Sequence, residues 1–301
     1  MALQFKKAKR SASKLRLALQ GASGSGKTYG ALLLAKGLGG RIAVIDTERG
    51  SASLYADDPV MPEFDVLELG APFTPEKYIE AINAAAEAGY DVLVIDSTTH
   101  EWSGSGGCLE LNDAIARSKY RGNTWSAWSE ITPRHRAFVD AMLTAPLHII
   151  ATMRSKTDTV QDEVNGRKVV KKVGMKAEQR DGMDYEYTIV FDLVCDGHIA
   201  NVSKDRTAMF KDPVVLSEEI GKKIKSWLES AGVTPEEFAT LLEETKKAPT
   251  LQALEEIGKK IALKGLCDED RLIMKKAYVA RRHELTAPPE PAPEPEEQPL
   301  E

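Results

Sequence analysis

The chain has few cysteines and no long apolar run, which excludes several classes of protein. Its 301 residues include three cysteines, Cys108, Cys195 and Cys267, and none of them belongs to a C-x-x-C pair. This spacing offers neither a disulfide framework nor a zinc motif, so a reducing cytoplasm is the expected location. No apolar segment approaches the roughly 20 residues that span a bilayer, and the start lacks the apolar core of a signal peptide. We therefore expect neither membrane insertion nor export.

Charge is distributed unevenly along the chain. The formal net charge is −6, yet residues 287–301 alone hold several glutamates and no base. Basic residues gather in two other places, namely Lys6, Lys7, Lys9, Arg10, Lys14 and Arg16, and later Arg167, Lys168, Lys171, Lys172 and Lys176. The length allows one large α/β domain with an appendage, or two modest domains. We expect a basic arm over 1–14, a core over 15–215, a helical module over 216–285 and a disordered proline- and glutamate-rich tail over 286–301.

A glycine-rich stretch near the start constrains function most tightly. Residues 21–28 read GASGSGKT, which matches the phosphate-loop pattern G-x-x-x-x-G-K-[ST]. In such a loop the backbone N–H groups surround the phosphates, Lys27 reaches the β- and γ-phosphates, and the Thr28 hydroxyl binds Mg²⁺. We expect ATP and Mg²⁺ as cofactors. The predicted nucleotide-binding residues are Gly21, Ala22, Ser23, Gly24, Ser25, Gly26, Lys27, Thr28 and Tyr29.

Strand and helix patterns alternate through the first two thirds of the chain. Predicted strands cover 15–19, 41–46, 64–69, 91–96 and 147–153, and helices are predicted over 28–36, 74–88, 108–118 and 133–143. This alternation predicts an α/β fold with a mostly parallel sheet that is covered on both faces. A hairpin is predicted where strands at 188–194 and 198–203 flank Asp196-Gly197. Residues 217–285 are predicted to be helical, with breaks at Pro249 and Gly265.

Carboxylates at two strand ends suit the chemistry of triphosphate hydrolysis. Asp96 ends an apolar strand, the setting of a Walker B residue that holds Mg²⁺ beside Thr28. Hydrolysis also needs a group that orients or deprotonates the attacking water. We expect Glu48, just past the strand that ends at Asp46, to take this role, because ligands of open α/β sheets gather at such strand ends. Glu101 is the reserve candidate.

These motifs together resemble the RecA-like ATPase core over roughly residues 15–210. The shared features are Asp-Thr-Glu-Arg-Gly after the second strand, Asp96-Ser97, and a later strand that ends in Ala-Thr-Met-Arg-Ser-Lys. Ser97 follows Asp96, so the Asp-Glu pair of AAA+ ATPases is absent. Among RecA-like proteins the chain looks most like phage-encoded annealing recombinases of the Sak group. The resemblance implies that Glu48 is catalytic, that Thr152 and Arg154 are sensors, and that the protein works in the cytoplasm of a bacterial host.

A basic pair after the predicted hairpin adds to the resemblance. Lys204-Asp205-Arg206 matches the Lys-x-Arg pair with which RecA-like ATPases reach the γ-phosphate bound by a neighbouring subunit. If the match holds, Lys204 and Arg206 are catalytic residues in trans, and the protein assembles as a ring or filament. The alternative is that both are solvated basic residues that follow a strand.

The resemblance also implies contact with single-stranded DNA. In RecA-like recombinases the loops after the Walker B strand and the sensor strand hold the nucleic acid, and these correspond to 97–125 and 155–187. Basic and aromatic residues there suit backbone charge and base stacking. The DNA-binding candidates are Lys119, Arg121, Lys156, Arg167, Lys168, Lys171 and Lys172. Alternatively, residues 160–173, with central Asn165-Gly166, form only a surface hairpin.

Other residues are expected to be structural. Trp125 and Trp128, three residues apart, are predicted to pack as one helix face, and His100 and His135 are expected to be solvated or packed because they have no partner histidines at metal spacing. The helical module resembles partner-docking modules of recombination proteins, which could bind a single-strand binding protein.

Three functions remain open at this stage. The favoured one is a DNA-stimulated ATPase that binds single-stranded DNA in recombination or annealing. The alternatives are a replicative helicase or loader, and a nucleotide-gated switch that contacts proteins and not DNA.

Overall fold

The computed structural model describes residues 14–164, 167–229, 235–262, 266 and 268–286. The chain divides into two compact units, with the boundary between Lys225 and Ser226. The first unit carries all the strands and the phosphate loop, and the second consists of helices. The predicted basic arm, apart from Lys14, and the predicted disordered tail, apart from Thr286, lie outside the described residues.

The first unit alternates strands and helices, as the sequence predicts. Its elements are β1 (Arg16–Gly21), α1 (Lys27–Leu38), β2 (Ile42–Asp46), η1 (Ala52–Tyr55), β3 (Asp65–Glu68), α2 (Pro75–Glu87), β4 (Val92–Asp96), α3 (Thr99–Ser103), α4 (Cys108–Lys119), α5 (Thr124–Thr144), β5 (His148–Val164), β6 (Arg167–Ala177), η2 (Met183–Glu186), β7 (Ile189–Leu193), η3 (Asp196–His198), β8 (Ile199–Asp205), β9 (Val214–Val215) and α6 (Glu218–Glu229).

The sheet places the phosphate-loop strand in its middle. The strand order is β3-β2-β4-β5-β1-β7-β8-β9, with β6 paired to β5 outside this path. The strands from β3 to β7 run parallel, and β8 returns antiparallel to β7 as the predicted hairpin. Parallel strands end at one edge of a sheet, so Gly21, Asp46 and Asp96 meet there. The predicted mostly parallel α/β fold is confirmed.

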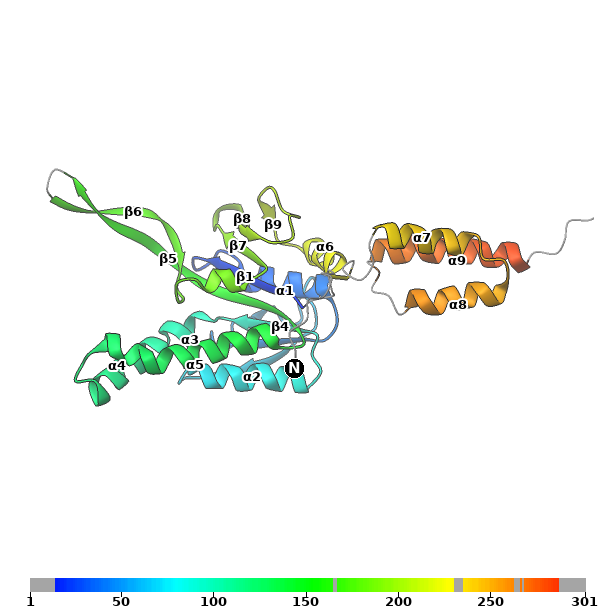
Figure 1. Cartoon of the computed structure of the whole chain (residues 1–301). Coiled ribbons are helices and arrows are strands. Elements are labelled where there is room, and N and C mark those ends of the chain that lie inside the picture. The colour runs from blue at the N-terminus through cyan, green and yellow to red at the C-terminus, as the bar shows by residue number, and fades with distance from the viewer. Residues whose placement is uncertain (1–13, 165–166, 230–234, 263–265, 267, 287–301) are drawn as a thin grey trace, which may run out of the picture. The chain divides into compact units, whose positions relative to one another are not determined.

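Helices cover both faces of the sheet (Figure 1). One face packs against α2 and α5 through a core that includes Tyr78, Ile95 and Phe138. The helix α1 packs on β1, β4 and β5 and is almost wholly buried. Its contact with α6 is very close: a side chain at Gly37 would come within 2.2 Å of the Glu218 carbonyl oxygen and 2.6 Å of Gly221 Cα. Glycine therefore permits this helix contact.

The helix caps explain one success and one failure of the sequence prediction. The side chain of Thr74 caps α2 and Pro75 occupies its first turn, as predicted. The prediction for α5 was too short, because it began at Pro133. The helix starts nine residues earlier, where the Asn123 side chain accepts a hydrogen bond from the backbone N–H of Ser126, and Pro133 lies inside it. Here tertiary packing outweighs the loss of the backbone hydrogen bond that Pro133, without an N–H group, cannot donate.

The strand β5 is longer than predicted and continues beyond the sheet. Its second half pairs antiparallel with β6, so the two strands form a long hairpin that extends away from the sheet (Figure 1). The two strands of the hairpin considered for residues 160–173 are thus present, and DNA contact there stays a prediction. We call β5 from Ser155 onward together with β6 the arm, which is a different segment from the basic arm predicted for residues 1–14. Side chains of residues 157–174 lie outside the description, as do residues 165–166.

Arg16 is a structural residue and not part of a solvated basic cluster. It is 6% exposed, and its guanidinium donates to the carbonyl groups of Leu143 and Ala145 at the end of α5. It also donates to the carbonyl groups of Leu147 and Leu15. Burial lowers the pKa of Arg16 to about 10, which leaves it charged at neutral pH. A cation at a helix carboxyl terminus compensates the exposed carbonyls and the helix dipole.

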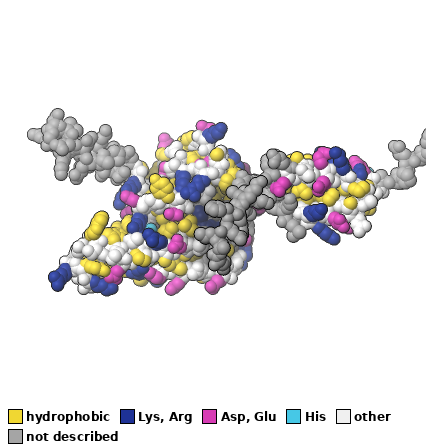
Figure 2. Space-filling view, in the orientation of Figure 1, with side chains coloured by type: hydrophobic (Ala, Val, Ile, Leu, Met, Phe, Trp, Pro, Cys, Tyr) yellow, Lys and Arg dark blue, Asp and Glu magenta, His cyan; other side chains and the backbone are white. Residues whose placement is uncertain are grey.

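The second unit contains α7 (Pro235–Lys246), α8 (Leu251–Ala262) and α9 (Asp268–Thr286). Its small core is formed by Leu241, Leu266 and Met274, so the predicted helical carboxyl-terminal part is confirmed. On the face shown in Figure 2, basic, acidic and apolar side chains are intermixed over these helices. None of the helices in the described part of the chain combines the length and apolar character that a bilayer span requires.

Candidate active site at the phosphate loop

The phosphate loop connects β1 to α1 at the carboxyl edge of the sheet. Gly24 and Gly26 have φ values of 79° and 90°, which favour glycine. A side chain at Gly21 would approach Ser25 Oγ to 2.5 Å. The hydroxyl of Ser25 is buried and has no hydrogen-bond partner. A buried, unpaired donor inside the loop fits a ligand with oxygen acceptors, such as a phosphate.

Lys27 lies at the centre of this edge. Its ammonium donates to the carbonyl oxygens of Gly21 and Ala22, at 3.1 and 2.8 Å. Burial lowers the pKa of Lys27, and the nearby carboxylates of Asp96 and Glu48 partly offset the shift. The flexible lysine side chain places its positive charge where it can bind phosphate oxygens.

Asp96 joins two predicted partners in one hydrogen-bond network. Its carboxylate accepts from the hydroxyls of Thr28 and Thr152, both at 2.5 Å. Burial raises the pKa of Asp96, whereas the two hydroxyl bonds lower it. The Thr28 hydroxyl and the Asp96 carboxylate are the hard oxygen donors that Mg²⁺ prefers. The structure thus brings the predicted metal ligands and the predicted sensor Thr152 together.

Glu48 lies at the same edge and is held by Arg154. The Arg154 guanidinium donates through Nε to Glu48 Oε1 at 3.0 Å and through Nη2 to Oε2. The Ser97 hydroxyl lies 3.4 Å from Glu48 Oε1. The side chains of Glu48 and Arg154 are 25% and 45% exposed, so this ion pair is accessible to solvent and easily broken.

Two buried residues that the sequence analysis missed shape the Glu48 loop. The Asp46 carboxylate accepts from the backbone N–H groups of Glu48 and Ala52, at 2.6 and 2.9 Å. The Thr47 hydroxyl accepts from the backbone N–H of Ser97 at 2.8 Å and ties the ends of β2 and β4 together. Asp46 ends a buried strand just as Asp96 does, and this position is the feature of the sequence that could have identified it.

The turn between β7 and β8 contacts the phosphate loop, which the sequence analysis also missed. The Nδ1 atom of His198 lies 3.3 Å from the Ser25 carbonyl oxygen, and Cys195 Sγ lies 3.5 Å from that of Ser23. Both residues are more than 165 positions from the loop, and no local pattern marks them. They support the loop from the neighbouring strand β7.

Lys204 and Arg206 lie away from the phosphate loop of their own chain. Asp205 pairs with Ile189, which pairs with Leu17, so it lies about 13 Å along β1 from Gly21. The Lys204 ammonium donates to the carbonyl oxygens of Asp184 and Tyr185, both at 2.7 Å, and Arg206 donates to that of Tyr185 at 2.9 Å. The structure does not bring the pair to Lys27.

The first predicted DNA loop is largely helical, since α3, α4 and the start of α5 occupy it. Arg121 is exposed, and Lys119 forms an ion pair with Glu130 at 2.7 Å. The prediction that two tryptophans form one packed face is wrong. Trp125 is 86% exposed, whereas Trp128 stacks on Trp102 with ring centroids 5.4 Å apart.

The second predicted DNA loop is the arm. Lys156 is exposed at its base. The remaining candidates occupy β6, and their side chains lie outside the described residues; they are Arg167, Lys168, Lys171 and Lys172.

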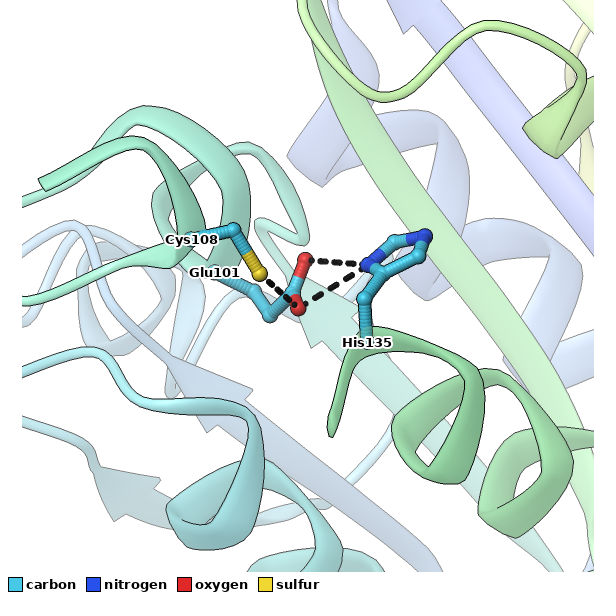
Figure 3. Close-up of side chains that lie close together, drawn as sticks. All are labelled: Glu101, Cys108 and His135. Carbon is cyan, nitrogen blue, oxygen red and sulfur yellow. Dashed lines mark hydrogen bonds and ion pairs between the residues drawn. The ribbon is translucent and has the colours of Figure 1, made fainter. Parts of the chain in front are cut away.

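Glu101 and the histidines are packed and do not contact the phosphate loop. Glu101 is fully buried beside Cys108 and His135, which does not suit its reserve role as a base for water (Figure 3). His100 stacks on Phe73 and lies 2.7 Å from the Thr47 hydroxyl. Burial lowers the pKa of His100 and raises that of the Cys108 thiol. Both histidines therefore pack against other side chains, which is one of the two environments expected for them.

Comparison with known families agrees with this geometry. The AAA domain family AAA_24 matches residues 13–219, which include the whole phosphate-loop edge and the arm. The chain belongs to this AAA domain family. It is therefore a P-loop ATPase, and within this AAA domain the strand β4 ends at Asp96 and is followed by Ser97.

The crystal structure of the RadB recombinase is similar to this AAA domain protein, with 16% identity and a TM-score of 0.34, over 64% of this chain and 83% of that chain. A search of curated proteins finds no match.

Proposed function

We propose that the protein is an ATPase that binds single-stranded DNA and acts in phage-type recombination or annealing. The observation that carries this proposal is the ion pair between Glu48 and Arg154. Arg154 lies on β5 where the strand leaves the sheet, and the same strand continues into the arm. The strand β5 therefore connects Arg154, which pairs with the candidate catalytic carboxylate of Glu48, to the candidate DNA-binding residues of the arm.

The strand geometry supports this coupling. Arg154 and Lys156 are two residues apart on β5 and are both exposed, so they lie on the same face of the strand. The proposed sensor Arg154 and the candidate DNA-binding residue Lys156 are thus neighbours. The arm also carries acidic residues, but its basic residues outnumber them, as contact with a DNA backbone requires.

Within this proposal each residue at the sheet edge has a role. The loop N–H groups, Ser25 and Lys27 hold the phosphates, and Thr28 and Asp96 hold Mg²⁺, which supplies charge neutralisation when bound. Glu48 orients and deprotonates the attacking water once Arg154 releases it. Exposed Tyr29, whose ring lies edge-on to that of Tyr55 with centroids 5.8 Å apart, offers an aromatic surface for the base.

Self-association follows from the position of the basic pair. Because Lys204 and Arg206 lie away from the phosphate loop of their own chain, they suit the phosphate of a neighbouring subunit. Such a contact is head-to-tail and generates a ring or a filament. The carboxyl-terminal helices are proposed to dock a single-strand binding protein or another recombination protein.

The test is salt-dependent binding of a fluorescent single-stranded oligonucleotide by anisotropy. The variant K168Q/K171Q/K172Q should weaken binding and lower the slope of log affinity against log salt by about 2, since each phosphate contact contributes about 0.7. The matched control K211Q/K222Q/K223Q changes three exposed lysines outside the arm and should bind as the wild type does.

The same assay separates the alternatives. Wild-type protein that binds no oligonucleotide at low salt contradicts the proposal and favours the nucleotide-gated protein switch. Binding together with ATP-driven unwinding of a duplex, and no annealing of complementary strands, favours a helicase or loader.

A further inference from the structure

Three side chains from three consecutive helices converge in the interior, apart from the ATP site. Glu101 on α3, Cys108 on α4 and His135 on α5 are each at least nine-tenths buried. Figure 3 shows the Glu101 carboxylate between the thiol and the imidazole, with all three pointing toward one another. Glu101 Oε1 lies 3.0 Å from Cys108 Sγ and 3.0 Å from His135 Nδ1, and Oε2 lies 3.2 Å from His135 Nδ1.

We propose that Glu101, Cys108 and His135 form a structural zinc site. A thiolate, an imidazole and a carboxylate are the three side-chain donors that zinc uses, whereas Mg²⁺ and Ca²⁺ prefer oxygen alone. Each residue offers one donor atom, so water would fill the fourth position of a tetrahedral zinc ion. Sequence patterns alone do not indicate this site, because its members span 35 positions and lack a zinc-motif spacing.

The distances are compatible with a bound zinc ion. With zinc bonds of about 2.0 to 2.3 Å, tetrahedral ligand atoms lie about 3.3 to 3.6 Å apart. The two separations of 3.0 Å from Glu101 Oε1 are shorter than this by about 0.3 to 0.6 Å, and all three donor atoms lie within 4.8 Å of one another, so small rotations of the side chains can bring them to zinc-bonding positions. Zinc binding would release the Cys108 thiol proton to solvent and leave the imidazole proton on Nε2 of His135, which Figure 3 shows on the far side of the ring.

The charge balance and the position of the cluster both favour a cation. Among the described residues, the ion-pair partner of the buried Glu101 carboxylate is His135, and neither Lys nor Arg pairs with it. The cluster also adjoins Gln179, which follows the arm and donates to the Thr98 carbonyl oxygen at 2.9 Å and to Glu101 Oε2 at 3.4 Å. Zinc here would brace α3, α4 and α5 beside the Walker B segment and the base of the arm.

The test measures metal on the purified full-length chain after zinc loading and desalting. We expect about one zinc per chain, and a thiolate-to-cobalt charge-transfer band when cobalt replaces zinc. C108S should lower the zinc content to less than about a tenth, and H135Q should do the same. The matched control C195S/C267S keeps Cys108 as the only cysteine and should retain both the zinc and the cobalt band.

Two results would overturn the proposal. One is wild-type protein with less than about a tenth of a zinc per chain and no cobalt band. The other is a C108S variant that holds zinc as the wild type does. If C108S fails to fold, the cobalt spectrum of C195S/C267S decides alone, because a site at Cys108 must give the thiolate band there and its absence refutes the site.

Discussion

The role of Glu48 can be tested by Glu48→Gln, which keeps the size of the side chain and removes its charge. A carboxylate that orients and deprotonates water contributes about 10²- to 10⁴-fold to a rate, or about 3 to 5 kcal/mol of barrier. The variant should therefore lose at least about 100-fold in kcat for ATP hydrolysis. Nucleotide binding should persist, because Lys27, Thr28 and Asp96 hold the phosphate and metal in this account.

The structure also predicts that the fold tolerates this change. Glu48 is partly exposed and its ion pair with Arg154 is open to solvent, so its loss should cost less than about 1 kcal/mol of unfolding free energy. The assay is steady-state ATPase activity together with binding of a fluorescent nucleotide. The matched control is Glu68→Gln, because Glu68 is an exposed carboxylate that pairs in register with Asp46 at the same sheet edge. A Glu48→Gln variant that turns over within threefold of the Glu68→Gln variant refutes the assignment.

Three further predictions concern stability and assembly. Arg16→Met should lower the free energy of unfolding in urea by about 3 kcal/mol, because buried carbonyls lose a charged donor; a change below about 0.5 kcal/mol contradicts this. Burial lowers the pKa of His148, which accepts from the Leu15 N–H, to about 4. Neutral His148 therefore contributes its full stabilisation of the fold above pH 6.5. As the pH falls and the side chain takes up a proton, the free energy of unfolding should decrease, by about 2 to 3 kcal/mol at pH 4.5. The variant His148→Asn should remove this part of the pH dependence. Mixing Lys27→Ala and Arg206→Ala subunits one to one should leave about a quarter of the sites with both an intact Lys27 and an intact Arg206 from the neighbouring subunit. ATPase activity should then exceed that of either variant alone, whereas no recovery argues against action in trans.

The sequence predicts the part of the site that consists of a contiguous motif or of strand ends. The phosphate loop is local. Asp96 ends an apolar strand and Thr152 lies near the end of the apolar segment 147–153, so parallel pairing of β4 and β5 brings them to one edge. Asp46 also ends a buried strand, so the same reasoning could have identified it. His198 could not be assigned in this way, because its partner is a loop far away in the chain, and such a contact arises only from the three-dimensional fold.

The same reason explains the errors in the helical region. The long α5 depends on packing against α2 and α4, and not on a local start signal at Pro133. Trp125 and Trp128 have helical spacing, yet only Trp128 finds a partner, Trp102. Periodicity predicts which residues share a helix, but it does not tell which of them another helix covers.

The central claim is that DNA on the arm controls hydrolysis at Glu48 through β5. It is tested most directly by the ATPase rate with and without single-stranded DNA, for the wild type and for K168Q/K171Q/K172Q. We expect DNA to stimulate ATP hydrolysis by the wild type and not by the arm variant, with the rate in the absence of DNA unchanged. Equal rates with and without DNA in the wild type, at a DNA concentration that saturates binding, would contradict it.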